Sequence, residues 1–159
     1  MSKTTLYEYL EALKDVFFIF ILHKFSFSLK KPEQTLPKVY LVDNGILYVN
    51  GIRDKGKLME NLVLVELKRR GKKVYYWSNN YELDFVIREG KKIRQLIQVC
   101  YDISDYETKE REIKALIKAS KELNCKDLLC ITWDYEGIEK IDRKKIKFLP
   151  LWKWLLNFY

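Results

Sequence analysis

One acidic residue lies where the hydrophobic pattern of a helix calls for an apolar side chain. Glu60 is followed after three, four and seven positions by Val63, Leu64 and Leu67, and these positions share one face of an α-helix. A carboxylate on such a face points into the protein or into a cleft. There it is costly unless a cation, a metal ion or a hydrogen-bond donor lies beside it. Glu60 is therefore a candidate site residue.

A second candidate, Asp84, lies in the middle of the segment 82–88, which alternates like a β-strand. The apolar residues expected on the opposite face from Asp84 are Leu83, Phe85 and Ile87. A three-residue loop at 90–92 would set Asp84 directly opposite Gln98 on the next strand. The alternation of that strand puts Arg94, Leu96 and Cys100 on the same face as Gln98. With Glu60 above them, three oxygen-bearing side chains converge on a place for one divalent cation.

The elements that must hold these residues follow the order helix, three strands, helix, strand. We expect a helix over 57–70 that ends at Gly71, strands over 74–77, 82–88 and 93–101, and a helix from a capping box at 104–107 to about 123. A strand over 127–133, short strands over 138–141 and 146–148, and a final helix that starts at Pro150 follow. The pattern predicts an α/β fold.

The first 37 residues are predicted to form a separate piece. Thr4 or Thr5 caps a helix that runs to Asp15, and the apolar segments 16–22 and 25–29 read as a hairpin. The proline-containing stretch 30–37 then acts as a linker. A helix followed by a hairpin is what remains of a winged helix without its first helices. We expect this piece, 1–37, to pack on the main domain, 38–159, or on a partner.

Composition narrows the class of protein. The 159 residues are 48% hydrophobic and carry a net charge of +8, which is typical of a folded domain and favours a polyanionic partner, most often nucleic acid. One histidine and three cysteines without a CxxC pair argue against a structural zinc site. The longest apolar run, 16–22, is too short to cross a bilayer. We therefore expect a cytoplasmic protein that does not bind a membrane.

A phosphate-loop pattern occurs at 51–57, where the sequence fits GxxxxGK. Such a loop needs Ser or Thr at the next position to bind Mg²⁺, and Leu58 stands there instead. We expect a chance match and no ATP binding by this chain.

Basic residues gather in two places. On the long helix, Arg111, Lys114 and Lys118, followed by Lys121, fall on one face and suit phosphate contacts, although pairs with Glu107 and Glu110 explain part of that stripe as solvated surface. The denser cluster is Lys68, Arg69, Arg70, Lys72 and Lys73. Tyr75, Tyr76 and Trp77 follow it, and at least two of these three aromatic residues are expected in the core. Glu66, before Arg69 and Arg70, reads as a surface ion pair.

The acidic residues and their order resemble the signature of the PD-(D/E)xK nuclease superfamily, in the segments MENLVLVELKRRG, ELDFVI and LIQVCYD. The chain also resembles a domain-of-unknown-function family that follows the ATPase module of many archaeal and bacterial AAA-type ATPases. PKVYLVDNGI, MENLVLVELKRRG, VYYW, ELDFVI and FLPLWKWLL carry that resemblance, which extends from about Thr4 to the C-terminus. It implies a restriction-endonuclease-like core, in which a mixed sheet is flanked by helices, after a winged-helix remnant.

By this resemblance Glu60, Asp84 and Gln98 would be the catalytic residues and Mg²⁺ ligands. Two positions depart from the pattern, because Gln98 replaces the expected carboxylate and Cys100 replaces the expected lysine. A neutral oxygen holds Mg²⁺ more weakly, and a thiol does not supply the charge of an ammonium group. Lys73 and Lys109 are candidates to reach into the site instead.

Three functions remain open at this point. The favoured interpretation is a nuclease-fold domain that binds nucleic acid, DNA before RNA, with a degenerate site that holds Mg²⁺ weakly and cuts weakly or not at all. The second is a regulatory module that contacts an AAA-type ATPase or copies of itself. The third is an active Mg²⁺-dependent endonuclease.

Overall fold

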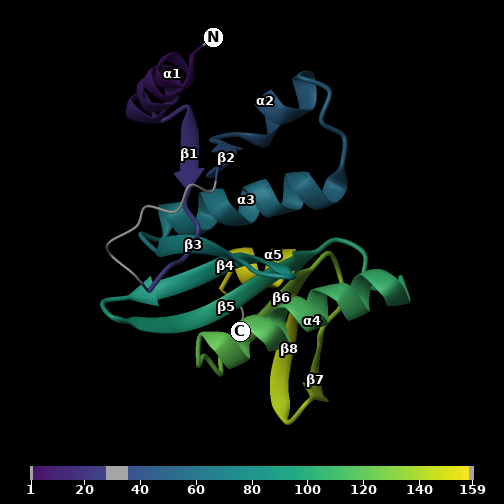
Figure 1. Cartoon of the computed structure of the whole chain (residues 1–159). Coiled ribbons are helices and arrows are strands. Elements are labelled where there is room, and N and C mark those ends of the chain that lie inside the picture. Colours follow the sequence, from purple (N-terminus) through teal and green to yellow (C-terminus); the bar gives the residue numbers. More distant parts are fainter. Residues whose placement is uncertain (1, 28–35, 158–159) are drawn as a thin grey trace.

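A mixed six-stranded sheet forms the centre of the protein, in a computed structural model that describes residues 2–27 and 36–157 (Figure 1). The strands lie in the order β3-β4-β5-β6-β8-β7. Their bounds are β3 Lys73–Ser78, β4 Glu82–Glu89, β5 Lys92–Cys100, β6 Leu128–Thr132, β7 Gly137–Ile141 and β8 Lys144–Pro150. Strands β3 to β5 are antiparallel, β5, β6 and β8 are parallel, and β7 returns antiparallel to β8.

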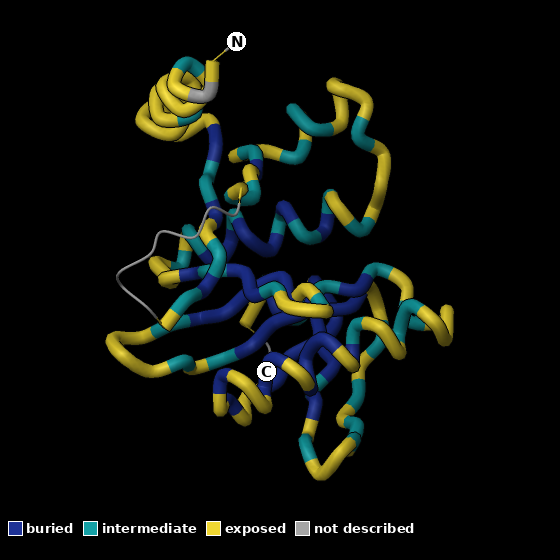
Figure 2. Tube along the Cα trace, in the orientation of Figure 1, coloured by how far each residue is buried: buried dark blue, intermediate teal, exposed yellow. Residues whose placement is uncertain are grey.

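Helices cover both faces of this sheet and divide the core into two clusters. On one face, α3 (Lys55–Arg69) and α5 (Leu151–Leu155) pack on Phe85, Ile97 and Ile131. On the other face, α4 (Tyr106–Glu122), the crossover between β5 and β6, packs on Val86, Leu96 and Phe148. Figure 2 shows this sheet as the buried centre of the molecule. The predicted α/β class, with a mixed sheet flanked by helices, is confirmed.

The N-terminal segment forms a helix and a small sheet of its own. Helix α1 (Lys3–Asp15) leads into β1 (Ile19–Leu22), which pairs antiparallel with β2 (Lys38–Leu41). The predicted hairpin between 16–22 and 25–29 was wrong, because β1 pairs with β2 and Phe25 packs into the core of the main sheet; residues 28–35, the end of that segment and most of the expected linker 30–37, lie outside the described residues. The helix cap is Ser2 rather than Thr4 or Thr5, since its side chain accepts from the Thr5 amide. The boundary at residue 37 stays a prediction.

Two further local differences concern helix starts. The segment KVYLVDNGILY at 38–48, for which the sequence predicts a strand and a turn, forms the strand β2 and then the short helix α2 (Asn44–Val49), capped by Asp43. Helix α4 is capped by Asp105, whose carboxylate accepts from the Thr108 amide at 2.9 Å, and not by Ser104. In both cases an Asp side chain supplies the oxygen that the first free amides of a helix require.

The β4–β5 register brings Asp84 and Gln98 opposite each other as predicted, but by another route. The turn between the strands has two residues, with Gly90 at φ 59°, so that Glu89 pairs with Lys92. This pairing is one residue away from the expected register. An irregularity between Ile87 and Arg88 removes the difference, so that Phe85 pairs with Ile97 as expected. A second irregularity lies between β3 and β4. It turns Leu83 to the α4 face, whereas Phe85 and Ile87 face α3. The prediction that these three share a face was therefore wrong.

No helix in the described ranges combines the length and the apolar character needed to cross a membrane.

Candidate functional site

Glu60, Asp84 and Gln98 line one cavity of about 580 Å³, where the N-terminal end of α3 meets the ends of β4 and β5. The other side chains that matter in this cavity are Lys57, Glu82, Arg111 and Glu112. The sequence-predicted convergence of Glu60, Asp84 and Gln98 is thus present in the structure, whereas the roles assigned to these residues stay predictions. We call this cavity the cleft.

Side chains replace the backbone ladder where β4 and β5 reach the cleft. The last ladder pair toward the cleft is Phe85–Ile97. Beyond it, the Asp84 amide donates to Oε1 of Gln98 at 3.2 Å, and the Val99 amide donates to Oδ2 of Asp84 at 2.9 Å. The two strands are therefore held by their own polar side chains at this point, which fixes Asp84 and Gln98, both buried, in position.

The cation beside the acidic residues comes from β2. The ammonium nitrogen of Lys38 lies 2.7 Å from Oε1 of Glu82, 3.3 Å from Oε1 of Glu60 and 3.9 Å from Oδ1 of Asp84. Tyr40, two residues along the same strand, donates its hydroxyl to the same oxygen of Glu60 at 2.6 Å. The expectation that Glu60 needs a cation or a donor is met by these two side chains.

Electrostatics in the cleft reflect burial and mutual repulsion. Burial, followed by the charge of Glu60, raises the pKa of Asp84 well above its ordinary value, and Lys38 and the Val99 amide only partly oppose this. Burial alone would lower the pKa of Lys38, but the charge of Glu60 and the contacts with Glu82 and Asp84 raise it overall. Lys38 therefore stays charged at neutral pH, and Asp84 takes a proton at a higher pH than an ordinary aspartate does.

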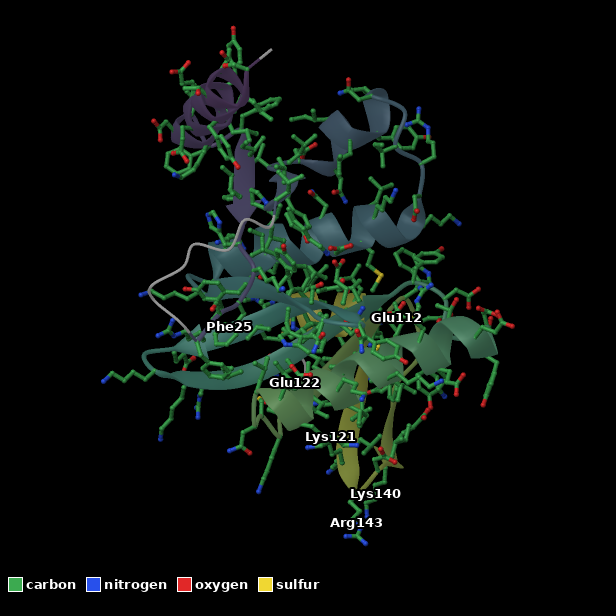
Figure 3. The ribbon with its side chains drawn as sticks, viewed as in Figure 1. Phe25, Glu112, Lys121, Glu122, Lys140 and Arg143 are labelled. Carbon is green, nitrogen blue, oxygen red and sulfur yellow. The ribbon has the colours of Figure 1, made fainter. Side chains whose placement is uncertain are left out.

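Glu112 is a site residue that the sequence reasoning missed. Its carboxylate accepts from the side-chain amide of Gln98 at 2.5 Å and from Arg111 at 2.6 Å, and Figure 3 labels it on α4 beside the sheet. The signal was present, because Ala115, Leu116 and Ala119 follow it after three, four and seven positions, which is the pattern that singled out Glu60.

Lys38 and Tyr40 were missed for a different reason. The sequence predicts a strand here but carries no signal that this strand crosses α3. That placement depends on Asn61, whose side chain binds both the amide and the carbonyl of Leu41 at 2.9 Å. Lys73 and Lys109, the lysines expected to reach the site, do not line the cleft. Lys73 lies opposite Arg88 in the β3–β4 ladder, at the end of β4 that is away from the cleft. Lys109 binds Glu139 at 2.6 Å.

Cys100 does not take over the role of the missing lysine. It is buried on the α4 face, and its thiol donates to the carbonyl of Asp102. Burial, with the nearby charge of Glu112, raises the pKa of this thiol to about 12. Cys100 is therefore neutral at physiological pH and is a packing residue.

The donor set of the cleft does not fit Mg²⁺ as it stands. Oε1 of Gln98 already accepts from Asp84, Oδ2 of Asp84 accepts from Val99, and Oε1 of Glu60 accepts from Tyr40 and Lys38. Mg²⁺ requires near-octahedral oxygens at about 2.0–2.1 Å, and an ammonium group occupies the space between the carboxylates. Within residues 2–27 and 36–157, no group of three or more His, Cys, Asp and Glu side chains is placed to hold a metal ion.

The predicted basic stripe on α4 begins at the cleft. Arg111 lines the cleft, and Lys114 and Lys118 lie exposed farther along the helix toward Lys121, which Figure 3 labels near the β7–β8 turn with Lys140 and Arg143. Lys114 pairs with Glu110 at 2.9 Å as expected. Arg111 pairs with Glu112 rather than with Glu107. The exposed cations of α4 therefore form a row that starts at the acidic residues of the cleft.

The second basic cluster lies at the opposite end of α3, away from the cleft, and part of it is structural. Arg70 binds Glu66 at 2.6 Å, donates to the carbonyls of Trp154 and Leu155, and stacks over the Trp154 ring. Glu66 is buried, so the expectation of a surface ion pair was wrong although the pair forms. The exposed members of the cluster are Arg69, Lys72 and Lys73, while Lys68 is half-buried. Tyr76 and Trp77 are buried, as expected.

Comparisons with known proteins place this chain among sequences of unknown function. Residues 55–154 match a family described as a domain of unknown function (DUF4143), and residues 1–55 match another domain of unknown function (DUF8612). An uncharacterized protein of Methanocaldococcus jannaschii is 39% identical over 170 residues, which covers 99% of this chain and 37% of that protein. An uncharacterized protein of Haemophilus influenzae is 30% identical over 156 residues, covering 95% of this chain and 37% of that protein. The chain thus spans 37% of the length of these two curated relatives.

Proposed function

This chain belongs to the DUF4143 family of domains, and we propose that it is a nuclease-like domain that binds nucleic acid without cutting it, as part of an AAA-type ATPase system. The supporting observation is the cleft. Glu60, Asp84 and Gln98 line one cleft, as the resemblance to PD-(D/E)xK nucleases implies for the catalytic residues, but one oxygen of each already accepts a hydrogen bond from the protein itself. A retained fold with a repurposed cleft accounts for both facts.

Nucleic acid is the favoured ligand because of where the cations lie. Arg111, Lys114 and Lys118 extend from the cleft along one exposed face of α4, and the chain carries a net charge of +8. Exposed ion pairs such as Lys114–Glu110 contribute only about 0–1 kcal/mol. Phosphates can therefore replace Glu110 at little cost and release the counterions of the nucleic acid. The exposed Arg69, Lys72 and Lys73 form a second basic surface at the other end of α3.

A binding measurement with matched charge reversals tests this function. The variant Lys114→Glu/Lys118→Glu changes the α4 face, and Lys91→Glu/Lys92→Glu changes net charge equally at the exposed β4–β5 turn, away from the cleft. Fluorescence anisotropy with short DNA and RNA, at about 50 to 200 mM salt, should show binding that weakens steeply with salt. The α4 variant should lose about tenfold in affinity and about two units of the salt slope, and the turn variant much less.

Two results would reject the proposal. Absence of binding at the lowest salt would exclude nucleic acid as the ligand, and equal losses in both variants would leave only a charge effect without a site. Incubation of supercoiled DNA with the protein and Mg²⁺ or Mn²⁺ should give no cleavage beyond that of an Asp84→Ala control. Cleavage above this control would favour the active endonuclease instead.

A second candidate function is a protein-interaction module, and it rests on α1. Leu6 and Leu13 are 40% and 39% exposed, and Phe17, just after the helix, is 74% exposed. Figure 2 shows the helix exposed over most of its length. Since the relatives are longer than this chain, their remaining part, an ATPase module by the resemblance, is the partner to test. Copurification of that part of the Methanocaldococcus jannaschii relative with this chain, lost in Leu6→Asp/Leu13→Asp, would favour this function; copurification unaffected by the variant would not.

A further inference from the structure

Lys38 lies beside three of the acidic residues that line the cleft. Its ammonium group faces three carboxylates from two elements, Glu60 of α3 and Glu82 and Asp84 of β4, at 3.3, 2.7 and 3.9 Å. An ammonium group has three hydrogens to donate and no acceptor. Glu82 and Glu60 lie within hydrogen-bond distance of it, Asp84 at 3.9 Å lies within ion-pair distance only, and the side chain of Lys38 is only 24% exposed. Among the described residues Lys57 is the lysine that lines the cleft, whereas Lys38 contacts three of the lining carboxylates from β2 without lining the cavity itself.

The position of Lys38 is determined by contacts outside the cleft. The Asn61 side chain binds the amide and the carbonyl of Leu41, three residues after Lys38, and so holds β2 against α3. Tyr40 packs its ring against Phe85 and donates its hydroxyl to Glu60. Because β2 is clamped at both Tyr40 and Leu41, the ammonium of Lys38 reaches the carboxylates from a fixed strand and not from a free loop.

We propose that Lys38 is the resident cation of the cleft and that its ammonium group and a divalent metal ion exclude each other. Three carboxylates around one point need positive charge, and Lys38 supplies it. A divalent ion at the same place would lie against a like charge in a half-buried site, where repulsion is strong. In this structure the three carboxylates surround the ammonium group and are not placed to hold a metal ion; without the ammonium, their oxygens are the donors that a hard divalent cation favours. This inference rests on the non-cleaving cleft of the proposed function, but it does not require nucleic-acid binding.

The cation and the carboxylates belong to different family segments. Lys38 lies in the part that matches the second domain of unknown function, residues 1–55, whereas Glu60, Glu82 and Asp84 lie in residues 55–154. The N-terminal segment therefore supplies the cation that faces these three carboxylates. The two segments form one composite site rather than two independent ones.

Titration of the full chain with Mn²⁺ tests the proposal. The variant Lys38→Met keeps the length of the side chain and removes its charge, and Lys38→Arg keeps the charge. By isothermal titration calorimetry at neutral pH, Lys38→Met should bind one Mn²⁺ at least about tenfold more tightly than the wild type or Lys38→Arg. Addition of Asp84→Asn to Lys38→Met should abolish the gain. Mn²⁺ should also raise the melting temperature of Lys38→Met alone.

Several outcomes would overturn the inference. Wild-type protein that binds one Mn²⁺ as tightly as Lys38→Met, with dependence on Asp84, would show that the ammonium does not occupy the metal position. A folded Lys38→Met variant that binds no Mn²⁺ would show that the carboxylates form no cation site. If Lys38→Met is unfolded in metal-free buffer, millimolar Mn²⁺ should restore its circular dichroism spectrum, and failure to do so counts against the proposal. Nucleic-acid binding of the wild type, measured separately, decides the proposed function independently.

Discussion

The backbone amide of Asp84 donates a hydrogen bond to the side-chain oxygen of Gln98, 3.2 Å away on the neighbouring strand. The amide nitrogen of the same Gln98 side chain donates to Glu112 on α4. Gln98 thus acts as acceptor toward β4 and as donor toward α4 at once. A carboxylate at this position accepts only, so the departure from the nuclease pattern at residue 98 matches the presence of Glu112.

Gln98→Glu, which restores the residue type of the nuclease pattern, should therefore destabilise the protein. At neutral pH it places a second carboxylate within hydrogen-bonding distance of Glu112 and removes the donor, at a cost of about 2 to 4 kcal/mol. The cost should shrink as pH falls, because a carboxyl that takes a proton donates again. Urea unfolding at several pH values measures this. A variant as stable as the wild type at neutral pH would mean that Glu112 moves away freely.

Asp84→Asn should leave the protein as stable as the wild type at neutral pH, or more stable by about 1 kcal/mol. Burial raises the pKa of Asp84 in the folded state, so the folded protein holds this proton more strongly than the unfolded chain. The wild type therefore loses stability as pH rises from the ordinary aspartate pKa through the raised one, and the variant does not. Thermal unfolding of both proteins, measured between about pH 4 and 8 with EDTA present, should show a difference in melting temperature that grows in favour of the variant as pH rises. A variant that becomes relatively less stable as pH rises would show that attraction to Lys38 dominates.

The structure agrees with the sequence wherever local pattern determines position. The 3.6-residue period around Glu60 and the alternation in β4 and β5 were sufficient to bring Glu60, Asp84 and Gln98 to one cleft. The correct pairing did not depend on the turn, since the two-residue turn at Gly90 and a bulge give the same register as the expected three-residue loop. Hydrophobic faces that must be buried determine the register more strongly than the loop does.

Features that depend on contacts distant in sequence could not be predicted in this way. Lys38 reaches the carboxylates of the cleft because Asn61, twenty positions after Leu41, binds that residue, and neither Asn61 nor Leu41 carries a local signal of the pairing. Leu83 turns to the α4 face because β3 and β4 are out of register by one residue at that point, which reverses the alternation. The burial of Glu66 likewise follows from Arg70, whose guanidinium is held by the C-terminal carbonyls of α5.

Glu66→Gln should lower stability by about 1 to 2 kcal/mol at neutral pH and make stability less sensitive to acid. Hydrogen bonds from Arg69 and then Arg70, which outweigh the effect of burial, lower the pKa of Glu66 from 4.5 to about 2. The contribution of this group is thus complete above pH 4.5 and is lost as pH falls toward 2. Denaturant unfolding of both proteins across this range gives the comparison. Parallel pH profiles would contradict the assignment, and Glu107→Gln, on the exposed start of α4, serves as the control.

Asn61→Leu should detach β2 from α3 and loosen the cation of the cleft. The side chain of Asn61 is buried and makes three hydrogen bonds, to the amide and carbonyl of Leu41 and to Asn44. A leucine of similar size leaves these partners unpaired, which costs about 2 to 4 kcal/mol. Hydrogen exchange followed by NMR should show the Leu41 amide exchanging at least about tenfold faster. The exchange rates of core amides in β6 should change only as much as the global free energy of unfolding predicts. The exposed Asn80→Leu should change neither quantity. If the Leu41 amide stays protected in Asn61→Leu, then β1 alone holds β2 in place, and the position of Lys38 does not depend on α3.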